Sequence, residues 1–380
     1  MRIALAYPDP VETTSLGRET LLIAETLRRH GAGVHIYQRP GPARPGVVQH
    51  TVGKTLAPTS RLRGAVALGR WAGAASRAIR RDRAQYEIVC AVGSAGWEHD
   101  LVRVHAVIRA EQQRWPERGG RDARAARPRA ALAPVLRPQI AVERSIQRLQ
   151  FRPGRFTQAL AVTDEVAEDL VQVLHVDSAR IEVIPCLIDY EKFAAVPDTA
   201  RVNEGSAQVL LFIGNDFARK GLAAAIRALP ELRRELRLVV VGGDDPAPFR
   251  RLAVELGVAD RIEFAGATTT PERFYERATV LLAPTTEDVW GMALVEAMAA
   301  GVPTIASSAA GAGPLVEQAG AGIVVDVADI EGLVRAIERI VDDPVTAAAM
   351  GDAGRRAAAA FQRSATNALI RAFEPRERGR

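Results

Sequence analysis

The chain has 380 residues, of which 48% are hydrophobic and 25% are charged, and its formal net charge is +5. This length exceeds one ordinary core and suits two domains of roughly 150–200 residues each. No apolar run reaches the roughly 18 residues that a membrane-spanning helix needs, and the first residues lack a signal-peptide pattern. The two cysteines, Cys90 and Cys186, give neither a disulfide framework nor metal-ligand spacing. We therefore expect a soluble, cytoplasmic protein.

Arginine is concentrated in two stretches of the first half. Residues 114–155 have arginines at 114, 118, 121, 124, 127, 129, 137, 144, 148, 152 and 155, and their acids are only Glu117, Asp122 and Glu143. The other stretch has arginines at 61, 63, 70, 77, 80, 81 and 83. Two interpretations stay open: a solvated face, or attraction to an anionic acceptor or a membrane surface. Nucleic acid is disfavoured, because few aromatic side chains are present for base stacking.

Short apolar runs alternate with helical spacing in the first half. We expect strands at residues 2–7, 33–37, 88–92, 101–104 and 158–162, and residues 181–185 close this half. Residues 21–27 have helical spacing, and His30-Gly31 marks the end of that helix. This alternation is typical of a parallel sheet. Residues 119–138, rich in Gly, Arg, Ala and Pro, are expected to form a loop or lid.

The second half repeats the pattern after an irregular stretch at residues 190–207. Strands are expected at residues 209–213, 238–241, 262–264, 280–282, 304–306 and 323–325, with helices at 223–229 and 249–256 among others. Glycine or proline follows several of these strands, as at Gly214, Gly242, Gly266 and Pro284. Ligands of open parallel sheets bind outside the carboxyl ends of the strands, so these positions are candidates for a binding site.

Residues 284–303 form the most informative block, P-T-T-E-D-V-W-G-M-A-L-V-E-A-M-A-A-G-V-P. A strand ends at Pro284, an acidic loop with Glu287 and Asp288 follows, and Gly291 opens a helix. The first turn of a helix offers unpaired N–H groups and a positive dipole end, which can hold a phosphate or a polar sugar. Glu296 lies in the first turns, where its carboxylate can accept hydrogen bonds from a ribose diol.

A second block, V-L-L-F-I-G-N-D-F-A-R-K-G, covers residues 209–221. A strand ends at Gly214, and two adjacent cations, Arg219 and Lys220, precede the next helix. Arginine as a planar fork and lysine as a point charge both suit a diphosphate.

Together these blocks resemble retaining glycosyltransferase family 4, and within it the branch that contains lipopolysaccharide-core glucosyltransferases. Its run E-G-F-G-x-x-x-x-E-A-M-A-x-G-x-P is matched in register by Gly291, Glu296, Ala297, Met298, Ala299, Gly301 and Pro303. The first glutamate of the family's E-x7-E motif aligns with Asp288, and Glu287 is the alternative first acid. Lys220 falls on the family lysine. Arg219 is expected to replace the family arginine, because Asn215 occupies its aligned position.

The resemblance is looser in the first half. The strand at residues 101–104 is followed by His105, and in the family a histidine at such a strand end can hydrogen-bond the donor sugar. The family's Gly-Gly pair after the first strand aligns with Thr14-Ser15. Their hydroxyls can cap the helix or donate hydrogen bonds, and Gly17 can provide the turn.

The resemblance implies an α/β protein of the GT-B fold, with two Rossmann-like domains facing across a cleft. Residues 1–190 would form the acceptor-binding domain, 191–207 the linker and 208–360 the nucleotide-sugar-binding domain. Residues 361–380 would form a helix that packs back on the first domain.

It also implies a role for each candidate residue. The catalytic candidates are Asp288, His105 and Glu296. The donor diphosphate would be bound by Arg219, Lys220, Gly291, Met292 and Ala293. The nucleotide would be bound by Glu296, Ala265, Gly266 and Gly214. The sugar and acceptor loop would comprise Thr14, Ser15, Gly17, Glu287 and Trp290.

The implied reaction is a metal-independent transfer of a sugar from a nucleoside diphosphate, with retention of configuration. We expect a UDP-sugar donor and no cofactor, with a small-molecule, glycan or lipid-linked acceptor. No phosphate-binding loop of the ATPase type and no dinucleotide fingerprint is found. Two alternatives stay open: a sugar-nucleotide 2-epimerase, and a non-catalytic protein that binds a donor or a partner.

Overall fold

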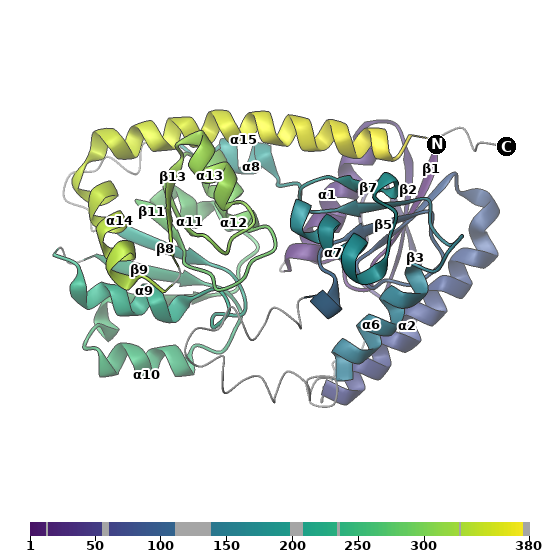
Figure 1. Ribbon diagram of the computed structural model, residues 1–380, viewed down its shortest axis with the longest axis horizontal. Helices are drawn as coiled ribbons and strands as arrows, with labels where there is room; N and C mark the ends of the chain where they lie inside the picture. Colours follow the sequence, from purple (N-terminus) through teal and green to yellow (C-terminus); the bar gives the residue numbers. More distant parts are fainter. Residues whose placement is uncertain are drawn as a thin grey trace. The chain divides into compact units, whose positions relative to one another are not determined.

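The computed structural model describes residues 1–12, 14–54, 61–110, 138–197, 208–233, 236–326 and 328–374. The chain forms two units, Met1–Leu187 with Ala365–Arg380 and Ile188–Ser364. Each unit contains one parallel sheet flanked by helices (Figure 1). The predicted α/β class with two Rossmann-like domains is confirmed. None of the helices in these ranges combines the length and the apolarity needed to cross a membrane.

The sheet of the first unit has seven strands in the order β3-β2-β1-β4-β5-β6-β7. Their bounds are β1 (Arg2–Ala6), β2 (Gly33–Gln38), β3 (Val47–Thr51), β4 (Ile88–Val92), β5 (Leu101–Val104), β6 (Gln158–Ala161) and β7 (Ile181–Val183). The inner strands β4, β5 and β6 are buried along their whole length. Strands of a sheet covered on both faces are continuous apolar runs, which is why the sequence revealed them.

Among the described residues, this sheet is accompanied by the helices α1 (Ser15–Arg29), α2 (Arg61–Asp82), α6 (Pro138–Gln150) and α7 (Asp164–Leu174). Helix α1 begins where the Thr14 hydroxyl accepts a hydrogen bond from Gly17 N at 3.2 Å. Sequence analysis had not singled out β3, α2 or α6. Strand β3 is a partly exposed edge strand, and α2 buries small residues such as Ala65, Ala72 and Ala75 that carry little periodic signal.

The second unit has a six-stranded sheet in the order β10-β9-β8-β11-β12-β13. Its strands are β8 (Val209–Ile213), β9 (Arg237–Val241), β10 (Ile262–Gly266), β11 (Val280–Ala283), β12 (Thr304–Ser307) and β13 (Gly322–Val325), each within two residues of its expected bounds. This order is that of a dinucleotide-binding sheet, and its direction of winding reverses between β8 and β11. A ligand site is expected at the carboxyl ends of these two strands.

The helices of the second unit are α8 (Tyr190–Ala194), α9 (Leu222–Ala228), α10 (Ala247–Glu255), α11 (Glu272–Arg277), α12 (Met292–Ala299), α13 (Gly313–Ala319) and α14 (Ile330–Asp342). A last helix, α15 (Pro344–Ala372), contributes its residues from Ala365 onward to the first unit. Helix α8 occupies the start of the expected linker, and residues 198–207 lie outside the described ranges. The expected lid at 119–138 lies outside them too, except for Pro138, which begins α6.

Candidate active site

The first element of the site is a close approach between two loops at the carboxyl edge of the second sheet. Gly221, the residue before α9, has φ +78°, and a Cβ atom there would lie 1.8 Å from the carbonyl oxygen of Pro284 after β11. Thr286 N donates to Arg219 O at 2.8 Å, and the hydroxyls of Thr285 and Thr286 donate to the same oxygen at 3.0 and 2.9 Å. The turn after β8 and the loop after β11 are therefore joined through backbone.

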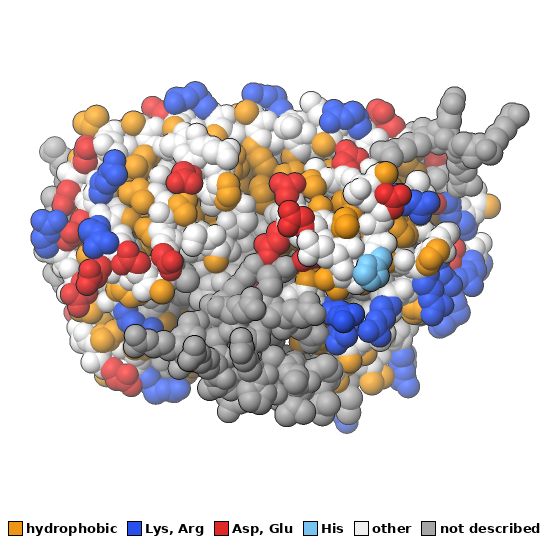
Figure 2. Space-filling model, viewed as in Figure 1, with side chains coloured by type: hydrophobic (Ala, Val, Ile, Leu, Met, Phe, Trp, Pro, Cys, Tyr) orange, Lys and Arg blue, Asp and Glu red, His pale blue; other side chains and the backbone are white. Residues whose placement is uncertain are grey.

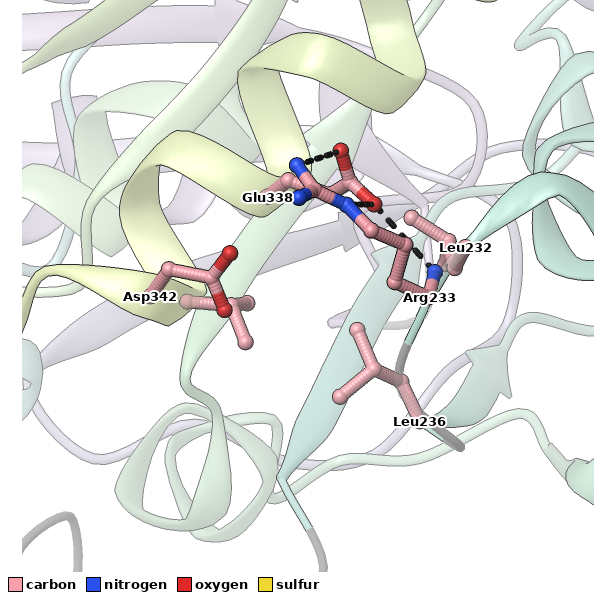
Figure 3. A pocket seen from close by; sticks show the side chains of 6 residues that line it. Leu232, Arg233, Leu236, Glu338 and Asp342 are labelled. Carbon is pink, nitrogen blue, oxygen red and sulfur yellow. Dashed lines mark hydrogen bonds and ion pairs between the residues drawn. The ribbon is translucent and has the colours of Figure 1, made fainter.

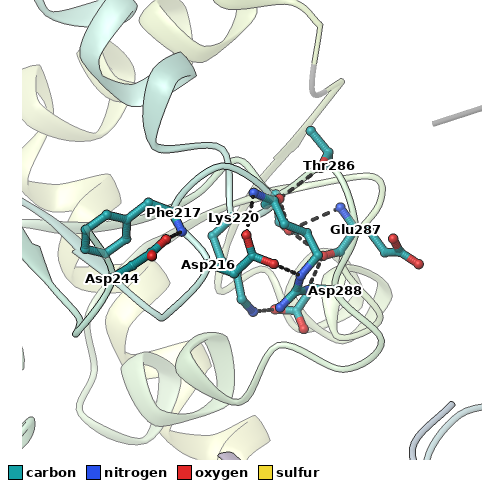
Figure 4. A network of polar contacts seen from close by, with 9 residues as sticks. Asp216, Phe217, Lys220, Asp244, Thr286, Glu287 and Asp288 are labelled. Carbon is teal, nitrogen blue, oxygen red and sulfur yellow. Dashed lines mark hydrogen bonds and ion pairs between the residues drawn. The ribbon is translucent and has the colours of Figure 1, made fainter. Parts of the chain in front are cut away.

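Charged side chains of these two loops meet (Figure 4). Lys220 Nζ forms an ion pair with Asp288 Oδ2. Arg219 Nη1 donates to Glu287 O at 2.7 Å, and Arg219 Nε pairs with Asp216 at 3.0 Å. The Glu287 side chain points away from this network, whereas Asp288 is directed toward Lys220 (Figure 4). Of the two candidate first acids, the structure therefore brings Asp288 to the predicted diphosphate-binding lysine.

The helix α12 begins beside this ion pair. Its first residues, Met292 and Ala293, follow Gly291, which has φ +91° and provides no side-chain cap. The loop before it is held by hydrogen bonds from Asp288 N to Ala309 O (3.2 Å) and from Gly311 N to Asp288 O (2.9 Å). A helix start with no side-chain cap, next to a lysine, favours binding of an anion.

Glu296, the expected ribose ligand, lies in the interior. It is only 1% exposed, and its Oε2 accepts a hydrogen bond from the hydroxyl of Tyr275 at 2.9 Å. Tyr275 is buried against the edge of Phe193. Sequence analysis missed Tyr275, because a single tyrosine in a short helix carries no signal of its partner. The contact of Glu296 with a ribose stays a prediction.

The other predicted residues of the second unit lie along the same edge of the sheet. Gly214 follows β8, and Ala265 and Gly266 end β10. Trp290 stacks on Phe361 of α15, with ring centroids 5.3 Å apart. These positions agree with a site at the carboxyl edge, and their roles as ligands stay predictions.

A separate polar cluster lies in the first unit, after the carboxyl end of β5. His105 Nε2 bonds Glu19 Oε2 of α1. Glu19 also forms an ion pair with Arg103 of β5, with Nη2 and Oε1 2.6 Å apart. Burial acts to raise the pKa of Glu19, but the charge of Arg103 and the hydrogen bonds from Arg103 and His105 outweigh burial and lower it to about 2. Sequence analysis missed Glu19 and Arg103, since 84 residues separate them.

The predicted residues of the loop after β1 lie at the start of α1, and Gly17 stands inside this helix and not in a turn. Thr14 caps α1, and Ser15 is the first residue of that helix. A Cβ atom on Gly17 would lie 2.4 Å from Val11 O, so this position requires glycine. Their contacts with a sugar or an acceptor stay predictions.

Figure 3 shows a pocket in the second unit that is lined by residues outside this site. Its lining residues are Leu232, Arg233, Leu236, Glu338, Val341 and Asp342. Leu236 directly precedes β9, which places the pocket at the amino edge of the sheet. Its main polar contact is an exposed ion pair, Arg233 with Glu338 at 2.8 Å. We therefore place the candidate site at the carboxyl edge and not here.

The fold of the chain is that of the GT-B class, two Rossmann-like domains in one chain. It is similar to the crystal structure of WaaG, a glycosyltransferase involved in lipopolysaccharide biosynthesis, with a TM-score of 0.78 and 20% identity over 97% of this chain and 99% of that chain. Residues 199–357, which lie within the second unit, match the family "Glycosyl transferases group 1". The predicted family resemblance is thereby confirmed.

Two curated relatives are similar to parts of this chain. The chain is 36% identical over 199 residues to a GDP-mannose-dependent alpha-(1-6)-phosphatidylinositol monomannoside mannosyltransferase of Mycolicibacterium smegmatis, covering 47% of this chain and 51% of the relative. It is 28% identical over 193 residues to the lipopolysaccharide glucosyltransferase WaaG of Escherichia coli, covering 48% and 52%. The matches thus span about half the length of these relatives.

Proposed function

We propose that the protein is a glycosyltransferase that moves a sugar from a nucleoside-diphosphate sugar to a hydroxyl group, with retention of configuration and without a metal ion. The observation that carries this proposal is the Lys220–Asp288 pair beside the start of α12, at the switch point of a group 1 domain. A cation and a helix start at this edge can neutralise a departing diphosphate, which is the role that a metal ion has in other transferases.

The ion pair suggests how donor binding would proceed. Lys220 is neutralised by Asp288 in the structure, and their side chains are 21% and 17% exposed. A diphosphate would compete with Asp288 for Lys220, because both are anions. Asp288 would then be free to accept hydrogen bonds from the sugar. Arg219 would contribute the second positive charge, and the N–H groups of Met292 and Ala293 would face the phosphates.

The identity of the donor rests on the relatives. The mycobacterial relative is named for GDP-mannose and the lipopolysaccharide enzyme for glucosyl transfer. We retain the UDP-sugar as the expected donor, with GDP-mannose as its competitor. Both names concern lipid-linked acceptors, and we propose an anionic or lipid-linked acceptor for this chain, with a cytoplasmic location.

The first test is a thermal-shift and calorimetry panel of UDP-, GDP-, dTDP- and ADP-sugars with EDTA present. One nucleotide is expected to stabilise the wild type, by about 2.7 kcal/mol at a ligand concentration 100 times Kd. The variant Glu296→Ala should lose this response, because the predicted ribose contact is removed. Gly257→Ala, at an exposed turn before the amino end of β10, is the control that should respond like the wild type. The absence of any response in the wild type would contradict the proposal.

The same preparations decide between the alternatives. A 2-epimerase would convert the donor with no acceptor present, and a non-catalytic protein would bind the nucleotide without hydrolysis or transfer. An Asp288→Ala variant that kept full transfer activity would contradict the catalytic role of Asp288.

We also propose that the arginine-rich face of α2 contacts an anionic membrane surface. Arg63, Arg70 and Arg77 are exposed and follow helical spacing with the exposed Val66. Figure 2 shows Lys and Arg side chains gathered over α2 and α6. The triple variant Arg63→Gln, Arg70→Gln, Arg77→Gln is expected to weaken binding to phosphatidylglycerol vesicles by about 1 kcal/mol per arginine. Vesicle flotation assays measure this loss of binding. Wild-type protein that bound phosphatidylcholine vesicles as strongly as phosphatidylglycerol vesicles would contradict the proposal.

A further inference from the structure

The imidazole of His105 contacts an ion pair that is buried in the first unit. Glu19 and Arg103 are each only 1% exposed, whereas the His105 side chain is 14% exposed. Arg103 donates to Glu19 Oε1 from Nε at 3.2 Å and from Nη2 at 2.6 Å. It also donates to the carbonyl oxygens of Ile184 and of Pro185, the latter at 3.0 Å. These hydrogen bonds hold the Arg103 guanidinium in place, and the guanidinium holds the Glu19 carboxylate in place.

We propose that Glu19 and Arg103 are positioning residues that set the tautomer and the orientation of His105 for substrate. Arg103 occupies Oε1 of Glu19, which leaves Oε2 to accept the proton of His105 Nε2. A histidine whose Nε2–H is held by a carboxylate has its lone pair on Nδ1 in the neutral form. Among the residues that the structure describes, His105 Nδ1 is buried and has no hydrogen-bond partner. Nδ1 would then be the atom that accepts a hydrogen bond from a substrate hydroxyl, a step that rests on the proposed function.

A metal ion is the competing explanation of this cluster. Ligand atoms of Glu19, His105 and Cys186 lie within 4.8 Å of one another. The Arg103 guanidinium, however, already binds the carboxylate that such an ion would need. A divalent cation there would be repelled by a fixed positive charge at hydrogen-bond distance from its ligand. The geometry therefore favours an ion pair that positions the imidazole.

The double variant Glu19→Met, Arg103→Met tests the proposal without leaving a buried charge. Replacing both members of a buried ion pair with apolar residues of similar volume is commonly neutral or stabilising. In the wild type, the ring ¹⁵N shifts of His105 should report a single Nε2–H tautomer. The signal is identified among the six histidines because it disappears in His105→Ala. In the double variant we expect a mixture of both tautomers.

Activity provides the second readout. The double variant is expected to lower kcat by about tenfold or more, the loss typical of one hydrogen bond to substrate. Its affinity for the free nucleoside diphosphate should be unchanged, because the predicted ligands of that group lie in the second unit. In a His105→Ala background the same double substitution should have no further effect on kcat. The variant Glu25→Gln, Arg28→Gln, which removes an exposed ion pair of the same helix, is the matched control.

The two readouts separate failure of the inference from failure of the proposed function. If the wild type turns over no sugar nucleotide, the proposed function fails, and the ¹⁵N shifts still test the positioning of His105. A wild-type Nδ1–H tautomer would overturn the inference. The inference would also be overturned if the double substitution lowered kcat further in the His105→Ala background. A purely structural role of Glu19 and Arg103 would have that effect. A His105 signal that shifts on adding EDTA would show a metal ligand instead.

Discussion

Replacing Arg103 alone with methionine is expected to destabilise the first unit by about 3–5 kcal/mol, because it leaves the carboxylate of Glu19 buried without its main counter-charge. Glu19 and Arg103 are each only 1% exposed, so water cannot take over the lost contact. Hydrogen exchange measured by mass spectrometry should show faster exchange in α1, β4 and β5, and unchanged exchange in the second unit. The double variant Glu19→Met, Arg103→Met is the control and should recover the lost stability. An Arg103→Met protein as stable as the wild type at pH 7 would contradict this account.

The contribution of Glu19 to stability should change with pH in opposite directions in the wild type and in Arg103→Met. In the folded wild type the pKa of Glu19 is about 2, below its ordinary value of 4.5. As the pH falls, the unfolded chain therefore takes up the proton first. The stability that Glu19 contributes is complete above pH 4.5 and is lost between 4.5 and about 2. In Arg103→Met the charge of Arg103 no longer opposes the effect of burial, so the pKa of Glu19 rises. Mild acidification should then protonate Glu19 and restore part of the lost stability.

Replacing Gly221 with alanine is expected to destabilise the second unit by about 2–5 kcal/mol, the sum of a left-handed backbone penalty and of overpacking. Its φ is +78°, and the added Cβ would lie 1.8 Å from Pro284 O, a backbone atom that cannot rotate away. The loops bearing Lys220 and Asp288 would have to separate. The variant should therefore also weaken the thermal response to the donor nucleotide.

Gly257→Ala is a matched control for the backbone penalty. Gly257 has φ +68°, and no heavy atom lies within 4 Å of the place of its Cβ. Only the left-handed backbone cost of about 1–2 kcal/mol is expected there. Thermal melts of both variants, with and without nucleotide, measure the difference. Equal losses in the two variants would show that the contact with Pro284 does not constrain the site.

Some features of the candidate site could be predicted from the sequence, and others could not. Lys220 and Asp288 were candidates because they align with the lysine and with the first acid of the motifs of the family that the sequence resembles. Their direct ion pair was not foreseen, since it depends on the approach of Gly221 to Pro284. Glu296 was expected at a ribose, and the structure places its carboxylate in the interior against Tyr275.

By itself, the sequence determined the α/β class, the strands of the second sheet and the loops that carry the candidate donor site. These follow from local patterns: continuous apolar runs for buried parallel strands, and glycines or charges directly after them. Only the tertiary structure decided the edge strand β3, the helix α2 and the partners of His105. The physical reason is that periodicity reports which side chains are buried, whereas strand order decides which buried charges meet. Arg103 reaches Glu19 across 84 residues because β5 and α1 pack in the same unit.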